Sequence, residues 1–397
     1  MGQTYDFETA PSRRGVGAAK WEGMYSEAKV PLPDDIIPFS VADMELRNPP
    51  EIVEGLKTHL NNVVLGYTRP TKSYFDAVVG YMKKWHNWDI DKEWIVPFSG
   101  VVPALFNAIK SLTAPGDGVI IMTPVYYPFY MAIEKTGRQA VKNPLLDDGE
   151  RFSIDYADLE QKAQQKENTM LILCSPHNPI GRVWKKEELE RVAEICLRNN
   201  VLVVSDEIHF DLILKGYEHT VFSTLSEEIA QNCIVCTSPS KTYNLAGIAC
   251  GNIIIKNPEL REKFTDEMGR NGTFSQALLA YKACELAYTE CGQWYQELLE
   301  LLERNKRLTE TFIKEQLPML KVRELQGTYL IWIDCRALGM DKKELERFMR
   351  EKALLFLDEG YIFGDAGAGF ERINLACPTK VLESALLRLK KAVDRRE

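Results

Sequence analysis

Three polar motifs in this chain directly follow apolar runs, and their side chains could share one reaction. The motifs are Ser-Pro-His-Asn-Pro at 175–179, Ser-Asp-Glu-Ile-His at 205–209 and Ser-Pro-Ser-Lys-Thr-Tyr-Asn at 238–244. If the apolar runs are neighbouring parallel strands, Asn178, Asp206 and Lys241 lie at one edge of one sheet. Ligands of open α/β sheets bind outside the carboxyl ends of the strands. The placement therefore predicts a site that brings an amide, a carboxylate and an amine together.

An amine near a carboxylate suits chemistry on a carbonyl group. A lysine in a pocket can form a Schiff base with a carbonyl cofactor. Pyridoxal 5'-phosphate (PLP) requires such a lysine, an acid for its ring nitrogen and donors for its phosphate. Lys241 and Asp206 meet the first two requirements, and Ser238 and Ser240 can supply hydroxyl donors. The sequence thus indicates PLP as the cofactor.

The elements that must position these residues are short apolar strands that alternate with helices. The apolar runs lie at 94–98, 119–122, 170–174, 201–205, 233–237 and 248–255. Helical stretches lie between several of them, for example at 101–112 and 186–198. The second of these begins with Glu187 and Glu188 and ends with Arg198, charges that suit the helix dipole. The alternation predicts the α/β class, with a doubly wound, mostly parallel sheet that is buried on both faces.

We expect three parts along the chain. Residues 1–50 are rich in proline and read as an N-terminal arm with little regular structure, and 51–288 read as a large PLP-binding domain. Residues 289–397 read as a smaller α+β domain, with which the arm is expected to pack. In this last part the helices are expected at 294–316 and 380–394, and the strands at 329–334 and 372–375.

Composition and charge exclude several classes of partner. The 397 residues include 49 basic and 57 acidic side chains, a net charge of −8, which disfavours nucleic acids and anionic membranes. No run of about 18 apolar residues is present, and the first twenty residues have no apolar core. We therefore expect no membrane span, no signal peptide and a cytoplasmic protein, whose nine cysteines are reduced.

Cys233 and Cys236 have the spacing of a metal or redox motif. Both lie in a run that reads as a buried strand, where residues three apart point to opposite faces. The two thiols then cannot bind one metal ion, so we predict structural cysteines and no metal site.

The motifs also carry a family resemblance. Asp206, the Ser-x-x-Lys pattern at 238–241 and Asn178-Pro179 resemble the fold-type-I PLP enzymes of the aspartate aminotransferase superfamily, over nearly the whole chain. Several segments are similar to the cystathionine β-lyase (cysteine-S-conjugate β-lyase) subgroup, namely Arg-Arg-Gly at 13–15 with Lys-Trp at 20–21, Ala-Asp-Met at 42–44, Gly-Tyr at 66–67, Pro-His-Asn-Pro-Ile-Gly-Arg-Val-Trp at 176–184, and 205–209. The resemblance implies a carbon–sulfur lyase that converts cystathionine, cysteine or cysteine S-conjugates to a thiol or hydrogen sulfide, pyruvate and ammonia.

The resemblance implies roles for the residues of the three motifs. Lys241 is the Schiff-base lysine and the general acid and base, and Asp206 pairs with the ring nitrogen. Asn178 bonds the ring hydroxyl and the substrate carboxylate. Each residue also has a purely structural alternative. Lys241 is then an exposed lysine in a turn, Asp206 a helix N-cap and Asn178 a turn residue. His209 contacts the ring hydroxyl or is a structural histidine.

Further roles by resemblance lie outside these motifs. Gly100, Val101 and Val102 give backbone amides to the cofactor phosphate at the start of a helix, unless they form only a turn. Tyr126 stacks on the ring, with Tyr127 as the alternative.

Two residues are implied to act on the substrate and across subunits. Arg372 binds the substrate carboxylate through two parallel hydrogen bonds, or is a surface arginine on an edge strand. Tyr67 reaches the neighbouring subunit's site, where the resemblance implies a catalytic and cofactor-binding role and hence a homodimer with shared sites. The alternative is that Tyr67 is a core aromatic.

One position departs from the broader superfamily. Many members carry an arginine eight residues after the lysine, as a phosphate ligand, where this chain has Ala249. The change fits the lyase subgroup better than the transaminases. An aminotransferase remains the first alternative function, and a PLP-bound regulator that acts through a protein partner is the second.

Overall fold

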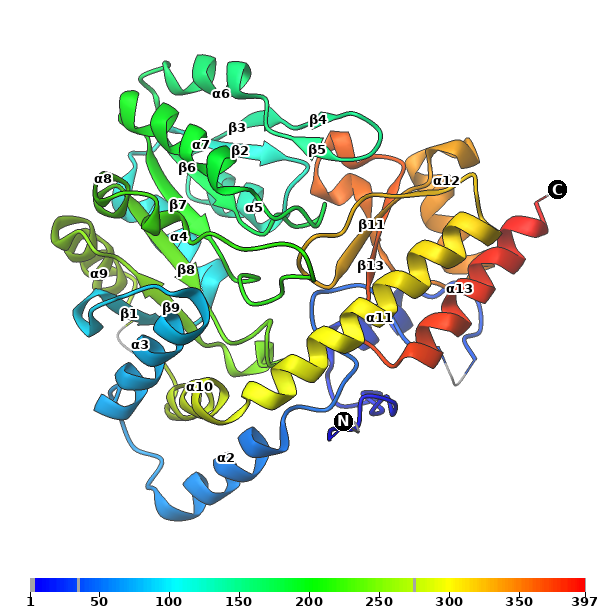
Figure 1. Ribbon diagram of the computed structural model, residues 1–397, viewed down its shortest axis with the longest axis horizontal. Helices are drawn as coiled ribbons and strands as arrows, with labels where there is room; N and C mark the ends of the chain where they lie inside the picture. The colour runs from blue at the N-terminus through cyan, green and yellow to red at the C-terminus, as the bar shows by residue number, and fades with distance from the viewer. Residues whose placement is uncertain (1–3, 34–35, 274–275, 397) are drawn as a thin grey trace.

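The computed structural model describes residues 4–33, 36–273 and 276–396, and it is built around one large sheet (Figure 1). In sheet order the strands are β1 (Ile95–Phe98), β9 (Gly251–Ile254), β8 (Cys233–Thr237), β7 (Leu202–Asp206), β6 (Asn168–Cys174), β2 (Gly118–Thr123) and β3 (Gln139–Pro144). Neighbours from β8 to β3 are parallel, whereas β9 is antiparallel to both β1 and β8. The predicted mostly parallel sheet is confirmed.

The central strands β2, β6, β7 and β8 are buried along almost their whole length because helices cover both faces of the sheet. The helices α4 (Val101–Leu112), α5 (Pro128–Lys135) and α9 (Pro258–Arg270) share one core with Ile234 and Cys236. Cys233 and Val235 belong to the core on the other face, with α6 (Tyr156–Ala163) and α7 (Lys186–Arg198). The two cysteines therefore face opposite sides, as predicted, and all nine cysteines of the chain are buried and unpaired.

Residues after the large sheet form a second, smaller sheet with its own helices. Its order is β10 (Lys321–Val322), β11 (Leu330–Asp334), β13 (Phe370–Asn374) and β12 (Asp358–Glu359), with every neighbouring pair antiparallel. The long helix α11 (Gly292–Gln316) leads into this sheet, and α12 (Lys342–Arg347) and α13 (Thr379–Asp394) pack with it (Figure 1). The remaining elements are α2 (Pro50–Asn62), α3 (Lys72–His86), α8 (Glu227–Gln231), α10 (Leu278–Glu290), β4 (Leu146–Asp147) and β5 (Phe152–Ser153).

The N-terminal arm differs from the expectation in one respect. It contains a helix, α1 (Ala19–Glu27), because Trp21 and Met24 lie three residues apart on one helical face and bury that face. Later in the arm, Phe39 N–H donates to Phe356 O at 2.8 Å. The arm thus packs on the C-terminal part of the chain, while the domain boundaries at 50 and 288 stay predictions.

No helix within the described residues is both long enough and apolar enough to cross a membrane. The same residues hold no group of three or more His, Cys, Asp or Glu side chains that could bind a metal ion.

Candidate active site

A cavity of about 210 Å³ lies at the carboxyl ends of β6, β7 and β8. It brings together most of the predicted site residues: Gly100, Val101, Val102, Tyr126, Asn178, Asp206, His209, Ser238, Ser240 and Lys241. Ala42 of the arm and Ala249 also line it. Each of the three motifs lies at this edge because a parallel sheet aligns the ends of its strands.

Lys241 points its amine at the arm. Its Nζ donates to the carbonyl oxygen of Ala42 at 2.6 Å, and Tyr329 Oη donates to the same oxygen at 2.9 Å. Burial lowers the pKa of Lys241 from 10.5 to about 8, although Asp43 and Asp206 oppose the shift. The lowered pKa increases the fraction of neutral amine, which is the form that attacks a carbonyl group.

Asp206 is the last residue of β7 and is almost fully buried. Burial raises the pKa of its carboxyl group to about 7, because the carboxylate loses its water. It accepts one hydrogen bond, from the Ile208 N–H at 3.1 Å, and it forms no ion pair within the described part of the chain. A turn follows it rather than a helix, so it is not a helix N-cap. The site therefore holds an acid that still needs a cationic N–H partner.

Arg372 does not line the cavity itself, but it contacts Asn178, which does. Arg372 Nη1 donates to Asn178 Oδ1 at 2.6 Å, and Nη2 pairs with Asp358 Oδ2 at 2.5 Å. Its Nε is buried and has no hydrogen-bond partner among the described residues. Arg372 lies on β13, between β11 and β12, and is 1% exposed, so it is not a surface arginine on an edge strand.

The helix α4 begins at one end of the cavity. Gly100 precedes its first residue with φ +108°, a backbone conformation that glycine adopts readily. The first N–H groups of a helix have no acceptor within the helix and favour an anion. A phosphate group bound here would meet the amides of Val101 and Val102.

The two serines contribute less than their hydroxyls suggest. Ser238 Oγ donates to Cys250 O at 2.6 Å, and Ser240 Oγ makes a long contact of 3.4 Å to Leu245 O. Both protons are thus directed at the backbone of their own loop. Ala249 lies nearby with φ +54°, and Lys241 is the one cation among the described residues that line the cavity.

The aromatic residues divide between the cavity and the surface. Tyr126 lines the cavity, and its neighbour Tyr127 is 43% exposed and lies outside it. His209 lines the cavity as well, and burial lowers its pKa, so its ring is neutral. Tyr67 is fully exposed, in the irregular segment 63–71, and is neither a core aromatic nor part of its own chain's cavity.

Sequence reasoning missed Tyr329 and Asp358, and it singled out Ala42 only as part of a motif. Ala42 contributes a backbone carbonyl, which any residue type could supply. Asp358 meets Arg372 across two paired strands. Residue type and spacing carry no signal for either contact.

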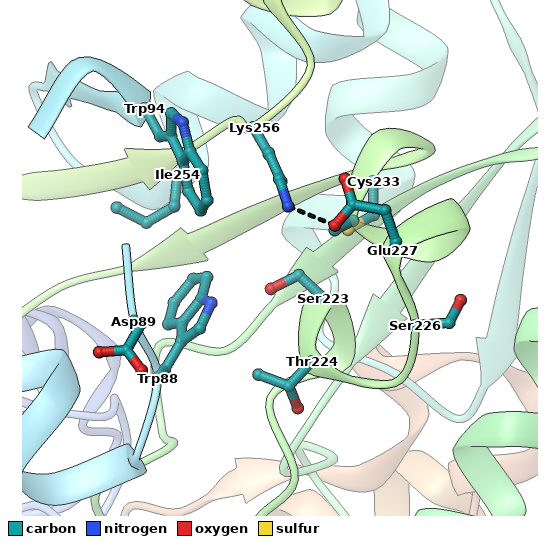
Figure 2. Close-up of a pocket in the computed structure, with 11 residues that line it drawn as sticks. Trp88, Asp89, Trp94, Ser223, Thr224, Ser226, Glu227, Cys233, Ile254 and Lys256 are labelled. Atoms are coloured by element: carbon teal, nitrogen blue, oxygen red, sulfur yellow. Dashed lines mark hydrogen bonds and ion pairs between the residues drawn. The ribbon is translucent and has the colours of Figure 1, made fainter. Parts of the chain in front are cut away.

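A second cavity, of about 240 Å³, lies at the opposite edge of the sheet, where β8 begins and β9 ends (Figure 2). Trp88, Trp94 and Ser223 line it, and its lysine, Lys256, is already paired with Glu227. None of the predicted site residues lies there, so the cavity at Lys241 is the candidate active site.

The residues at this site fit PLP. An unpaired buried carboxylate suits a protonated ring nitrogen, an amine of lowered pKa suits a carbonyl carbon, and a free helix N-terminus suits a phosphate. Lys241, Asp206 and the start of α4 are the groups that would hold the cofactor.

Comparisons with known proteins give a consistent result. Residues 34–389 match the model of the family described as aminotransferase class I and II. The chain is 40% identical over 388 residues to cystathionine beta-lyase PatB of Bacillus subtilis (strain 168). The matched region covers 98% of this chain and 100% of that protein.

Two solved structures are similar along their whole lengths. Cystalysin from Treponema denticola, which contains a pyridoxal 5'-phosphate cofactor, matches with a TM-score of 0.96 and 49% identity over 100% of both chains. The PLP-bound C-S lyase from Staphylococcus hominis matches with a TM-score of 0.91 and 29% identity over 98% of both chains.

Proposed function

Since the chain belongs to the aminotransferase class I and II family, we propose that it is a PLP-dependent carbon–sulfur β-lyase. It cleaves cystathionine, cysteine or cysteine S-conjugates to a thiol or hydrogen sulfide, pyruvate and ammonia. The observation that carries this proposal is one cavity lined by Lys241, Asp206 and Asn178, the last of which accepts a hydrogen bond from Arg372. A relative that is 40% identical over 98% of the chain is itself a cystathionine β-lyase.

Arg372 and Asn178 are the residues that bind the substrate's α-carboxylate. A guanidinium binds a carboxylate through its planar set of N–H donors. The unpaired Nε of Arg372 is a buried donor that costs free energy until an acceptor reaches it. A carboxylate meets that need, and its binding fixes the orientation of the amino acid.

Lys241 is the residue that moves the proton. With a pKa of about 8, a fraction of the amine is neutral near pH 7 and can take the proton from the substrate's Cα. PLP, when bound, supplies the electron sink that makes this proton acidic. The ammonium of Lys241 then holds a proton that the departing sulfur can take. Water completes the products, since cystathionine and water give homocysteine, pyruvate and ammonia.

The competing function is that of an aminotransferase, which would use the same residues up to removal of the α-proton. After that step, loss of the thiol competes with transamination. A difference of about 3 kcal/mol between the two barriers would favour one set of products over the other by roughly 100-fold. Ala249, at the position where many superfamily members have arginine, favours the lyase subgroup.

We also propose that the protein is a cytoplasmic homodimer with shared sites. Tyr67, Val64 and Leu65 are 113%, 88% and 74% exposed, and a second copy of the chain would cover them. Tyr67 of the second copy would then supply a further hydroxyl at the phosphate end of the cavity.

A product assay tests the lyase function. The holoenzyme is incubated with cystathionine and no keto acid, and pyruvate and free thiol are followed through many turnovers. Sustained, equal release of the two is expected, and Lys241→Ala should abolish it. If turnover stops after one equivalent per site and resumes only with a keto acid, the protein is an aminotransferase.

A further inference from the structure

A cluster of four charged side chains lies next to the Lys241 contact and has no part in the function above. Arg13 Nη2 lies 2.7 Å from Asp43 Oδ2, and Arg13 Nη1 lies 2.8 Å from Glu45 Oε1. Lys20 Nζ lies 2.9 Å from Asp43 Oδ1 and 2.9 Å from Glu45 Oε1. Trp21 Nε1 donates to the other oxygen of Glu45 at 3.1 Å. Except for Glu45, these residues belong to the segments that resembled the lyase subgroup.

Burial makes the geometry of this cluster difficult to change. The side chains of Lys20 and Glu45 are 1% and 2% exposed. Each cation meets both carboxylates, so the two positive and two negative charges balance. Moving one partner would leave a buried charge uncompensated, which is strongly unfavourable. The cluster therefore fixes the arm at residues 43–45.

The fixed arm presents the Ala42 carbonyl to Lys241. Lys20 Nζ also donates to the backbone carbonyl of Asp43, the next residue, at 2.9 Å. On the other side, Val41 has φ +55°, which is rare for a β-branched residue, and its N–H donates to Asp358 Oδ2 at 2.9 Å. Such a conformation persists only where the surroundings hold it. The orientation of the Ala42 carbonyl is thus held from both sides.

We propose that the cluster of Arg13, Lys20, Asp43 and Glu45 positions the amine of Lys241 for proton transfer, acting through the Ala42 carbonyl. This inference rests on the proposed function, which assigns the α-proton to Lys241. A neutral amine that donates one N–H to a fixed acceptor rotates less freely than an unbonded amine. Its lone pair, which takes up the proton, therefore adopts fewer orientations. The same carbonyl stabilises the ammonium after the proton has arrived. Arg13 and Lys20 are positioning residues, since they contact the arm.

Changes of charge near Lys241 would alter its protonation as well as its position. Asp43 and Asp206 raise the pKa of Lys241, while Arg372 and Lys20 lower it. Arg13→Lys keeps the charge and removes the forked contact with Asp43. Arg13→Lys therefore tests the position of the Lys241 amine without changing the charge near it. Lys20→Met, which also removes a charge, is the more severe second variant.

The first test measures proton transfer alone in the holoenzyme. L-Alanine has no leaving group on Cβ, so the exchange of its α-hydrogen in D₂O, followed by NMR, occurs in a lyase and in an aminotransferase. Arg13→Lys should slow exchange at saturating alanine by about tenfold, because a misplacement of ~1 Å can cost about 100-fold in rate. Lys20→Met should slow it further. The alanine concentration at half-maximal rate should stay within about threefold of wild type, because Arg372 and Asn178 are intact.

Arg323→Lys is the matched control. Arg323 also pairs with two carboxylates, Asp147 at 3.0 Å and Asp334 at 3.1 Å, and its side chain is 2% exposed. Among the described residues, no hydrogen bond or ion pair joins Arg323 to residues 41–45. This variant should lose stability and keep the wild-type exchange rate.

A second test uses the apoprotein and needs no catalysis. Acetylation of Lys241 by acetic anhydride is measured by mass spectrometry at about pH 9.5, where an amine of pKa about 8 is neutral. Arg13→Lys and Lys20→Met should react severalfold faster than wild type and Arg323→Lys, because the Ala42 carbonyl no longer holds the amine. If both variants lose stability while exchange and acetylation stay at wild-type rates, the cluster is only structural and the inference is wrong. If the wild-type holoenzyme shows no exchange, the proposed function fails, and acetylation still decides the inference.

Discussion

Arg372 depends on the planar shape of its side chain. Its guanidinium bonds Asn178 with one nitrogen and Asp358 with another, and leaves Nε for a third acceptor. Arg372→Lys keeps the charge and cannot make these contacts together. We expect kcat/KM for cystathionine to fall by about 10–150-fold, the loss of a charge-assisted hydrogen bond worth roughly 1.5–3 kcal/mol. Circular dichroism should show the wild-type fold, and an unchanged kcat/KM would mean that another group binds the carboxylate.

Asp206 is suited to the cofactor at the expense of the apoprotein. Burial raises its pKa from 3.8 to about 7, so the folded state binds its proton more tightly than the unfolded state. The stability that this group contributes is full below about pH 4 and is lost as the pH rises to about 7. The upper limit of the loss is about 4 kcal/mol, since one pKa unit corresponds to roughly 1.4 kcal/mol.

We therefore expect Asp206→Asn to stabilise the apoprotein in a pH-dependent way. Its Tm should match that of wild type near pH 4 and exceed it by a few degrees at pH 8, as measured by scanning calorimetry. Asp334→Asn is the opposite control, because ion pairing with Arg336 and Arg323 lowers the pKa of Asp334 against the effect of burial. That variant should be less stable than wild type at pH 8. A Tm difference for Asp206→Asn that does not vary with pH would contradict the argument.

At the scale of elements, the backbone of η6 (Gly360–Phe363) lies close to that of β13, the strand that carries Arg372. A Cβ on Gly360 would collide with the carbonyl oxygen of Gly367 and lie 2.5 Å from that of Phe370. Gly360→Ala must therefore push η6 away from the strand that carries Arg372. We expect a loss of about 1–3 kcal/mol in the free energy of unfolding, together with a higher KM for cystathionine.

Gly80→Ala provides the comparison for this prediction. Gly80 lies inside α3, and a Cβ there meets nothing within 4 Å. Alanine should raise the free energy of unfolding by about 0.5–1 kcal/mol, as is usual within a helix, and leave KM unchanged. Equal effects of the two substitutions on KM would show that the contact at Gly360 does not position Arg372.

The elements that the sequence predicted best are those with a strong periodic pattern. The helices α4 and α7 begin and end at the predicted residues, because apolar residues recur on one face and charges mark the ends of α7. β3 was not predicted, because it is an edge strand in which only Asn143 is buried and polar residues interrupt the apolar ones. α1 was missed because the segment around it is rich in proline, which indicates irregular structure, and because the helix has only a few apolar residues on its buried face.

The site was predictable to the extent that it depends on side chains at strand ends. Asn178, Asp206 and Lys241 follow three parallel strands, and the topology alone brings them to one cavity. The contacts of Lys241 with Ala42 and of Arg372 with Asp358 were not predictable. They join segments distant in sequence or involve the backbone, so residue type gives no indication of them.

At the scale of the whole molecule, exposed apolar side chains gather on α2 and the segment after it. Leu60, Val64, Leu65 and Tyr67 are all exposed, and α2 projects away from the body of the chain (Figure 1). Contiguous exposed apolar side chains of this kind mark interaction surfaces. A second copy of the chain is the occupant that we propose.

Mixing two inactive variants tests the shared sites. In a heterodimer of Lys241→Ala and Tyr67→Phe subunits, one site receives both lesions and the other receives neither. Activity should return to about half the wild-type value per heterodimer, because one of its two sites is intact. If subunit exchange is verified by mass spectrometry and activity does not return, Tyr67 does not act across subunits.

The burial of every cysteine has a consequence for an enzyme whose products are sulfur nucleophiles. Burial raises the pKa of seven of the nine thiols: Cys174, Cys196, Cys233, Cys236, Cys291, Cys335 and Cys377. A cysteine thiolate forms a mixed disulfide by attacking a sulfur that is already in a disulfide, such as the disulfide formed when a released thiol has been oxidised. These seven groups remain protonated and out of reach of solvent. These seven cysteines are therefore protected from exchange with the oxidised, disulfide form of a thiol product.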